Sequence, residues 1–399
     1  MAYTQTPLAT LRSKPGSLLQ KLYSEFGLIK TELDALTAGT RSATIVVAAS
    51  DSSEKSKAQA DYVCDGTNDD VTIQTAINSL QSGGKVQLME GNYDIRATIL
   101  IPGNTTLQGI HGCTVLTCPS AVGLEGSKVI KEQTVNTGNI VIKDIVIDGT
   151  DHAAYLIYLS DVYSSLVSNV ETRNAIEHGI QINTSSVGDG SPAKYNEISS
   201  CVSHDNARAG IRLGGPTRTI VTNNFVYNNG YEAPYYGGIW CNNRASKGLI
   251  TNNIICRNGY GIALLGATDF VVAQNIITDS AASAIYTDTH FEIVPRNIII
   301  TDNYISGKTL NLSTGTNIQV SNNLGYVTNN VGSATVTASS TTVDVTHGLA
   351  ATPTRVLLTP TTSTAGKQYY VSAKTATTFT ITIDSEADDD ITFDWQAVI

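Results

Sequence analysis

Residues 253–277 read NIICRNGYGIALLGATDFVVAQNII. This segment begins and ends with one pattern, an Asn followed by two apolar residues, and a Gly-Ile pair at Gly261 stands between the two copies. The pattern recurs every 20 to 30 residues or so, which indicates a solenoid. Its copies start at a polar residue, usually Asn: Asp144, Asn169, Ser200, Asn224, Asn253, Asn275, Asn303 and Asn323.

The repeats predict strands rather than helices. They are rich in Ile, Val, Thr and Tyr, which suit pleated strands, and they contain short alternating runs such as Ile180-Gln181-Ile182. Coils of three short parallel strands need about this many residues, and stacked coils bury a continuous apolar column. We therefore expect a parallel β-helix. The recurrent Asn is expected in a turn, with left-handed backbone geometry and an amide bonded to the equivalent Asn one rung away.

The bulk composition excludes some classes of function. The chain has 399 residues, 41% hydrophobic and 15% charged, with a net charge of −10. An acidic chain is a poor partner for nucleic acid, and no apolar run is long enough for a membrane span. The first residues contain no apolar secretory region, so we expect synthesis in the cytosol and, outside the cell, release by a route such as lysis. The six Cys are expected to be reduced structural thiols.

Residues 1–40 form the first predicted unit. Apolar residues recur at three- and four-residue intervals between Ser17 and Leu36, which predicts an amphipathic helix. Two interpretations remain open: the helix packs on its own domain, or it joins a short parallel bundle between subunits. In the second case it serves oligomerisation or attachment.

Residues 41–328 form the predicted β-helix domain. A strand at 43–48 is followed by a polar run at 51–57 and then by a helix near 70–80, for which Asp69 or Asp70 is a candidate cap. We expect this helix to cover the open apolar end of the first rung.

The start of this domain carries a family resemblance. Four segments follow one another here: Asp65-Gly-Thr-Asn-Asp-Asp70, the helix with Ala76-Ile77, Gly83-Gly-Lys-Val86 and Glu90-Gly-Asn-Tyr93. This succession resembles the start of the right-handed parallel β-helix proteins of the pectate-lyase-like superfamily. The resemblance covers about residues 60–325. It implies the fold, but the superfamily contains hydrolases, lyases, epimerases and non-catalytic adhesins.

Residues 333–399 follow a predicted hinge at Gly325–Gly332 and read as strands spaced for a small antiparallel β-sandwich. This segment resembles the C-terminal domain of many bacteriophage tail and tail-fibre proteins. The resemblance lies in His347-Gly-Leu, Pro353, Val356–Pro360 and Phe393-Asp-Trp395. That resemblance implies a tailspike-like protein of the virion tail. It also implies a homotrimer, whose N-terminus contacts other tail proteins. The expected fold class is thus all-β, with an N-terminal helix and a C-terminal sandwich.

Aligning the rungs on the Asn pattern predicts a first column of polar residues. It consists of Asp148, Arg173, His204, Asn228, Arg257 and Asp279. One-rung neighbours lie about 4.8 Å apart, so His204 is expected beside Arg173 and Asn228, with Asp205 next to it. The loops nearby add the candidates Asp151, Glu177 and His178.

A second column follows the Gly-Ile pairs and suits a sugar. It consists of Gln181, Arg212, Trp240, Ala263 and Tyr286, with Tyr158 in the rung before. A pyranose stacks on an aromatic ring, and Arg212 can pair with an acidic sugar. The long loop at 229–237 adds Glu232, Tyr235 and Tyr236 above Trp240.

These residues fit two chemistries. Hydrolysis of a glycoside needs two carboxylates about 5–5.5 or 6.5–9.5 Å apart, for which Glu177, Asp205, Glu232 and Asp151 are candidates. Elimination or epimerisation needs a base, an acid and a cation, for which His178, His204, Tyr235 or Tyr236, and Arg212 are candidates.

The sequence therefore predicts a protein that binds and depolymerises a bacterial surface or capsular polysaccharide, with hydrolysis favoured. The alternatives are a non-catalytic adhesin or tail component and a free-standing uronan lyase or epimerase. No cofactor or metal is expected. Ca²⁺ at Asp384, Glu386 and Asp388–Asp390 is a weaker alternative to a solvated acidic hairpin.

Overall fold

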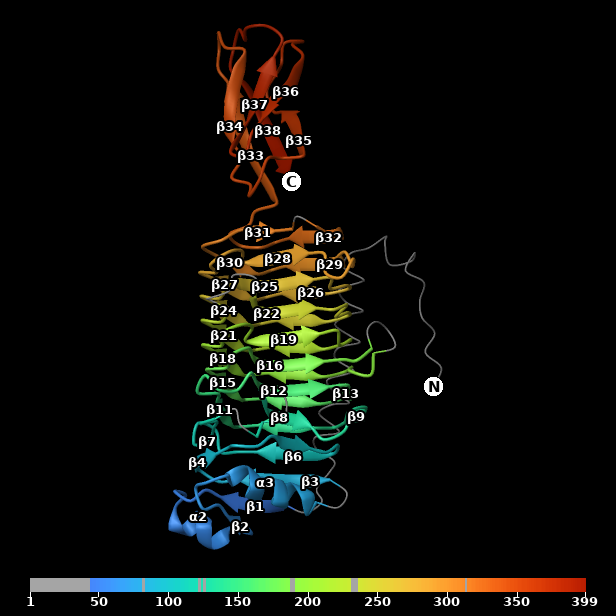
Figure 1. The fold of residues 1–399 in the computed structure, drawn as a ribbon. Coiled ribbons are helices and arrows are strands. Elements are labelled where there is room, and N and C mark those ends of the chain that lie inside the picture. Colours follow the sequence, from blue (N-terminus) through green and yellow to red (C-terminus); the bar gives the residue numbers. More distant parts are fainter. Residues whose placement is uncertain are drawn as a thin grey trace.

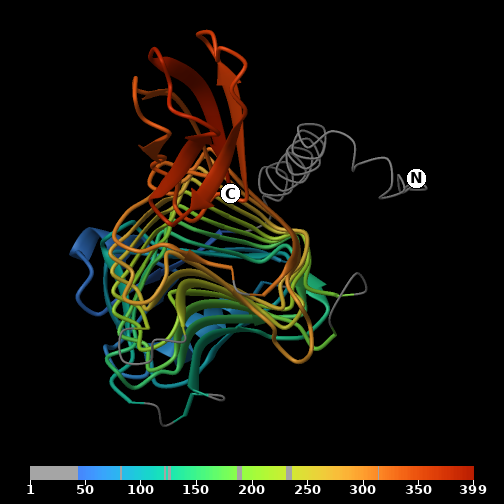
Figure 2. The ribbon, with the colours of Figure 1, turned by 90° about the horizontal axis from the view of Figure 1, so that it is seen from above.

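The computed structural model describes residues 44–80, 83–120, 123–124, 127–186, 191–230, 236–312 and 314–399. Short strands stack into a tall cylinder, and a smaller group of strands follows it at the C-terminal end (Figure 1). Seen from above, successive coils lie nearly on top of one another (Figure 2). The expected parallel β-helix is confirmed. The helix expected between Ser17 and Leu36 lies outside the described residues.

Three parallel sheets form the walls of the cylinder, and each complete coil contributes one strand to each sheet; sheet A has additional strands at both ends. In spatial order, sheet A consists of β2 (Tyr62–Val63), β1 (Thr44–Ala48), β3 (Gly84–Leu88), β6 (Thr105–Gln108), β10 (Val141–Lys143), β14 (Leu166–Ser168), β17 (Glu197–Ser199), β20 (Ile220–Thr222), β23 (Leu249–Thr251), β26 (Val271–Ala273), β29 (Arg296–Thr301) and β32 (Thr316–Ser321). Sheet B consists of β30 (Tyr304–Ile305), β27 (Ile276–Thr278), β24 (Ile254–Cys256), β21 (Phe225–Tyr227), β18 (Val202–His204), β15 (Glu171–Arg173), β11 (Val146–Asp148), β7 (Thr114–Thr117) and β4 (Gly91–Asp94). Sheet C consists of β31 (Leu310–Asn311), β28 (Ile285–Asp288), β25 (Tyr260–Leu265), β22 (Gly237–Asn242), β19 (Ile211–Gly214), β16 (His178–Asn183), β12 (Tyr155–Ser160), β8 (Lys128–Glu132) and β5 (Ile99–Ile101). A short pair, β9 (Thr137–Gly138) and β13 (Val162–Tyr163), lies beside them.

Alternation along the strands separates core from surface. In sheet A the middle residues Val221, Ile250, Val272 and Ile300 occupy successive rungs and have no exposed surface. Each such side chain stabilises the fold by about 1.5–3 kcal/mol through burial. The residues on either side of them point away from the core, so the outer faces of the sheets carry the columns from which a site can be built.

Two ladders of buried Asn hold the turns. Oδ1 of Asn253 accepts hydrogen bonds from the backbone N–H and the amide of Asn224, at 2.9 Å each. The same contacts repeat through Asn275, Asn303 and Asn323, and a second ladder joins Asn206, Asn229 and Asn258. The expected contact between equivalent Asn residues is confirmed. The expected left-handed geometry is found at the first copies, Asp144, Asn169 and Ser200, whereas from Asn224 onward the left-handed residue is the one before the ladder Asn, as at Asn223 and Asn252.

Two described helices lie at the N-terminal end of the β-helix, α2 (Glu54–Gln59) and α3 (Asp69–Asn78). The sequence analysis described the segment of α2 only as a polar run and predicted no helix there. Its N-terminus is capped by the Ser53 hydroxyl, which accepts from the N–H of Ser56. The N-cap of α3 is Asn68, not Asp69 or Asp70. Those carboxylates instead accept from the backbone N–H groups of Asp94 and Arg96, so they attach the helix to the first coil. Neither helix is long or apolar enough to span a membrane.

The C-terminal strands form two antiparallel sheets. One consists of β33 (Asn329–Val336), β38 (Ile391–Val398) and β35 (Arg355–Pro360). The other consists of β34 (Thr342–Thr346), β37 (Thr378–Ile383) and β36 (Tyr369–Lys374). Phe379, Phe393 and Trp395 are buried between them in a core separate from that of the coil. The expected small sandwich is confirmed.

Candidate functional site

The outer face of sheet C carries the predicted sugar-binding column. Tyr158, Gln181, Arg212, Trp240, Ala263 and Tyr286 are register partners on successive strands, as the sequence predicted. The guanidinium of Arg212 lies over the Trp240 ring, 4.7 Å from its centroid, and Nη1 of Arg212 donates to Oε1 of Gln181 at 3.2 Å. Side chains of the column therefore hold one another in place through contacts between neighbouring rungs.

Aromatic rings gather around Arg212. The ring centroids of His178 and Trp240 are 5.6 Å apart, and those of Tyr236 and Trp240 are 4.9 Å apart in an edge-to-face arrangement. Tyr155 lies on the other side of His178 with a centroid distance of 5.7 Å. We call His178, Arg212, Tyr236, Trp240 and Tyr155, together with Glu177 and Arg208 beside them, the Arg212 cluster.

The protonation of His178 follows from its contacts. It has no exposed surface, and its Nδ1 accepts a hydrogen bond from the backbone N–H of Ala209 at 3.0 Å. Burial, together with the positive charges of Arg212 and Arg208, holds the pKa of His178 well below its ordinary value. The ring is neutral at pH 7, and because Nδ1 is an acceptor, its proton lies on Nε2. His178 is thus a hydrogen-bond donor toward the cluster. It is not the base that the sequence analysis considered.

Three polar atoms of the cluster are buried without a partner. They are Nε2 of His178, Nε of Arg212 and Nε1 of Trp240. All three carry hydrogen and donate, and buried donors are normally satisfied. Three unpartnered donors on neighbouring side chains are expected of a site that accepts a negatively charged or oxygen-rich group.

Glu177 supplies a carboxylate at the edge of the cluster. Its Oε2 accepts a short hydrogen bond from the Tyr155 hydroxyl, and its Oε1 pairs with Nη1 of Arg208 at 3.1 Å. Burial and this contact raise the pKa of Tyr155 to about 12, so the phenol keeps its proton at neutral pH. Burial lowers the pKa of Arg212, but a guanidinium stays charged. Arg208 and Arg212 therefore outweigh Glu177, and the local charge is positive.

The other sequence candidates near sheet C lie farther away or outside the described residues. Tyr286 is two rungs beyond Trp240, where its ring stacks on Tyr260 at 4.5 Å and its hydroxyl bonds Asp288 at 2.6 Å. Asp151 is exposed on the turn between β11 and β12. Glu232 and Tyr235 fall in the undescribed segment 231–235.

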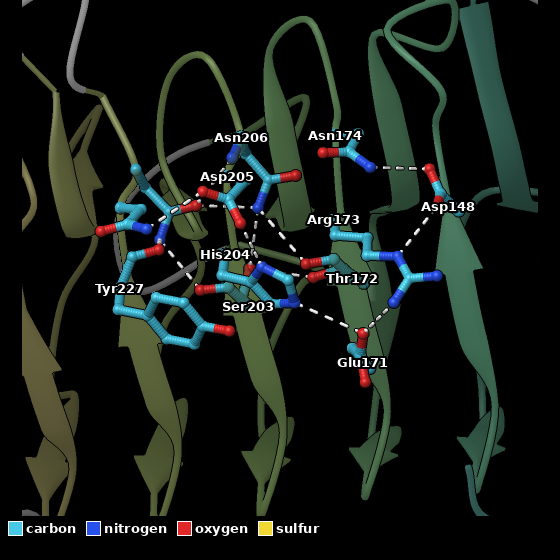
Figure 3. A network of polar contacts seen from close by, with 12 residues as sticks. Asp148, Glu171, Thr172, Arg173, Asn174, Ser203, His204, Asp205, Asn206 and Tyr227 are labelled. Carbon is cyan, nitrogen blue, oxygen red and sulfur yellow. Dashed lines mark hydrogen bonds and ion pairs between the residues drawn. The ribbon is translucent and has the colours of Figure 1, made fainter.

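The candidates Arg173, His204 and Asp205 belong to a different face. On sheet B, Arg173 pairs with Asp148 at 2.8 Å and with Glu171 at 2.7 Å (Figure 3). The His204 ring lies between Glu171, at 3.3 Å from Nε2, and Asp205, at 2.6 Å from Nδ1. Each of these ionisable groups has a hydrogen-bond or ion-pair partner within the row, which is typical of a structural network.

One predicted neighbour in this row is wrong. The register partner of His204 on the next strand is Tyr227, not Asn228, and the two rings stack with their planes 3° apart. The sequence offers Asn223 and Asn224 in succession, and alignment on the second one shifted the column by one residue. A shift of one residue moves a side chain to the other face of a strand.

Sequence reasoning did not single out Tyr155, and it placed Arg208 among the charged loop residues without pairing it with Glu177. Tyr155 is three residues before Tyr158, so strict alternation along a strand would place the two on opposite faces. In the structure both are half-buried and their ring centroids lie 5.3 Å apart. Arg208 is in a turn outside the repeated motif, and its partner Glu177 is one coil earlier, so no short-range pattern connects them.

Comparisons with known proteins agree with this fold. The family model of the right-handed β-helix region matches residues 231–348, and no curated protein sequence matches the chain. The chain is similar to the A-module of a mannuronan C-5 epimerase from Azotobacter vinelandii, with 15% identity over 64% of this chain and 93% of that one, at a TM-score of 0.49. It is also similar to tailspike protein gp49 of the Acinetobacter baumannii bacteriophage Fri1, a capsular polysaccharide depolymerase. The identity is 13% over 90% of this chain and 85% of that one, at a TM-score of 0.42. The Dettilon tailspike protein is 12% identical over 82% of this chain and 90% of its own length, at a TM-score of 0.36. The family model and the stacked parallel sheets together identify a right-handed parallel β-helix.

Proposed function

We propose that this protein binds and depolymerises an acidic polysaccharide at the Arg212 cluster. The observation that carries the proposal is the set of three unpartnered donors on His178, Arg212 and Trp240. A sugar carboxylate can accept from Arg212 and His178, while the rings of Trp240 and Tyr236 flank the sugar. The positive local charge favours an acidic sugar over a neutral one.

Elimination is the reaction that these groups support best. Glu177 takes the C5 proton of the acidic sugar, and the electrons of that bond form the C4–C5 double bond. The C4–O bond breaks, and the leaving oxygen takes the proton of the Tyr155 hydroxyl, which Tyr155 regains from Glu177. Arg212 and the Nε2–H of His178 stabilise the charge that develops on the carboxylate.

Hydrolysis, which the sequence analysis favoured, is the second candidate. It requires a second carboxylate across the bond from Glu177. Glu232 is the sequence candidate for that role. Release of reducing ends without an unsaturated product would favour hydrolysis.

We also infer that copies of the chain associate, as expected of a tailspike-like protein in a virion tail. Sheet B carries a column of exposed apolar residues on five successive rungs: Phe225, Ile254, Ile276, Tyr304 and Leu324. The outward apolar residues of sheet A, by contrast, are buried within the single chain. A continuous exposed apolar surface favours contact with another protein surface, and its lack of charge suits a second copy.

The test uses the full chain with alginate, polygalacturonate and hyaluronan, and with dextran as the neutral control. We expect at least one acidic polymer to shorten and to give an unsaturated product that absorbs ultraviolet light. Binding of an acidic polymer without any shortening would instead favour the non-catalytic adhesin. The absence of both binding and cleavage would overturn the proposal.

A further inference from the structure

A lysine reaches the outer face of sheet C on the N-terminal side of the Arg212 cluster. Lys128 is on β8 and is the register partner of Tyr155, which in turn pairs with His178 on β16. These three residues therefore occupy successive rungs of one column. Nζ of Lys128 lies 4.6 Å from the centroid of the Tyr158 ring and 5.8 Å from that of the Tyr155 ring. The ammonium group thus lies beside two aromatic rings of the proposed sugar-binding surface.

Neighbouring rungs hold both rings in place. The Tyr155 hydroxyl donates to Oε2 of Glu177, and the Tyr158 hydroxyl accepts from Nδ2 of Asn183 at 3.0 Å. The two rings meet edge to face, with their centroids 5.3 Å apart. A lysine ammonium is attracted electrostatically to the faces of aromatic rings. The two rings therefore restrict the position of a side chain that is flexible by itself.

The positive charge of Lys128 has no carboxylate partner. Among the residues that the structure describes, none forms an ion pair with Lys128 or accepts a hydrogen bond from its Nζ. The carboxylate bonded to Tyr155, that of Glu177, pairs instead with Arg208. An ammonium has three N–H donors, so those of Lys128 are available to a ligand. Lys128, Tyr155 and Tyr158 are all partly exposed, so a ligand can reach this part of the face.

Lys128 and Arg212 are two cations on one face of the β-helix. Their strands, β8 and β19, are three rungs apart, which corresponds to about 14 Å at the spacing of paired strands. The side chains reach toward each other, because Lys128 lies over Tyr158 one rung above it and Arg212 donates to Gln181 one rung below it. One acidic sugar unit carries one carboxylate. A ligand that contacts both cations therefore needs two acidic units and extends along the axis of the β-helix.

We propose that Lys128, with the rings of Tyr155 and Tyr158, forms a second acidic-sugar subsite. It binds the carboxylate of another unit of the polysaccharide held at Arg212. This inference rests on the proposed function, because it needs an acidic polymer at the Arg212 cluster. It narrows the substrate class to polymers with acidic groups on at least two nearby units. It also directs the polymer along the stacked rungs of sheet C.

The test compares full-chain Lys128→Gln with the wild type. The probes are tetrasaccharides of alginate, polygalacturonate and hyaluronan, followed by calorimetry, and the monosaccharides glucuronate and galacturonate, followed by saturation-transfer NMR. Lys128→Gln is expected to bind the preferred tetrasaccharide about tenfold more weakly and the acidic monosaccharide unchanged, because a single unit occupies the Arg212 cluster alone. Added salt is expected to weaken tetrasaccharide binding less in Lys128→Gln than in the wild type, because one ion pair fewer is screened.

Two further variants show whether the charge at this position matters. Lys128→Arg keeps the positive charge and is expected to bind both probes like the wild type. Lys143→Gln removes a partly exposed lysine from sheet A and is also expected to alter neither probe. A purely structural role of Lys128 predicts a different result, in which Lys128→Gln weakens the tetrasaccharide and the monosaccharide equally.

Arg212→Gln separates the possible failures, because it is expected to weaken both probes. If Arg212→Gln weakens both while Lys128→Gln matches the wild type, the subsite is overturned and the proposed function stands. The same conclusion follows if Lys128→Gln weakens both probes equally. If the wild type binds none of the probes, the subsite and the proposed function are both overturned.

Discussion

The backbone N–H of Ala209 donates a hydrogen bond to Nδ1 of His178 across one rung of sheet C, at 3.0 Å. This contact sets the tautomer of a buried neutral imidazole and directs its Nε2–H into the Arg212 cluster. The sequence analysis considered His178 as a base. The hydrogen bond from the neighbouring coil instead makes it a hydrogen-bond donor.

The buried His178 makes stability depend on pH. Its pKa in the folded protein lies well below the ordinary value of 6.5, so the unfolded chain binds the proton more readily. The free energy of unfolding is therefore expected to fall as pH decreases below about 6.5, by at most about 1.4 kcal/mol per pH unit. Urea unfolding at several pH values should show this slope in the wild type and a smaller slope in His178→Gln. The exposed His111→Gln serves as control, and equal slopes in all three proteins would contradict the assignment.

Glu177 and Glu171 provide a matched pair for locating the reaction. Both carboxylates contact an Arg, Glu177 on sheet C and Glu171 on sheet B. Glu177→Gln is expected to lower kcat by about 10²–10⁴-fold with little change in polymer binding, because it removes the group that takes the proton. Glu171→Gln is expected to keep wild-type turnover. A loss of turnover in Glu171→Gln alone would move the active site to the His204 network.

The Asn ladder should contribute strongly to stability. Asn253 has no exposed surface, and its amide contacts Asn224, Asn275 and the carbonyl of Val221. Asn253→Leu leaves several buried groups unpaired, each at a cost of about 1–3 kcal/mol. We expect a large drop in the thermal midpoint by calorimetry, with no comparable effect of the exposed Gln133→Leu. A midpoint within experimental error of the wild type would show that the ladder is not structural.

The apolar column of sheet B predicts self-association. Ile254→Asp with Ile276→Asp places two charges on exposed apolar positions. Analytical ultracentrifugation should show smaller particles for this variant than for the wild type, whereas Gln319→Asp on sheet A should not change the size. A wild type that sediments as a monomer at all concentrations would refute the inference.

The sequence predicted the column of sheet C correctly because a Gly-Ile pair marks the strand start on most of its rungs, so the register of Gln181, Arg212 and Trp240 was unambiguous. It misplaced Asn228 because two successive Asn residues offered two registers, and burial alone decides between them. The pairing of Glu177 with Arg208 and the tautomer of His178 depend on turn geometry one coil away. No repeat within the sequence encodes such contacts.

The central claim concerns Arg212, and one measurement tests it most directly. The initial rate of unsaturated product from the preferred acidic polysaccharide is compared between the wild type and Arg212→Gln, at equal protein concentration and with folding checked by circular dichroism. We predict that kcat/KM falls by about 100-fold or more in Arg212→Gln, as expected when a charge-stabilising donor is lost. A folded Arg212→Gln protein that forms product at the wild-type rate would contradict the account.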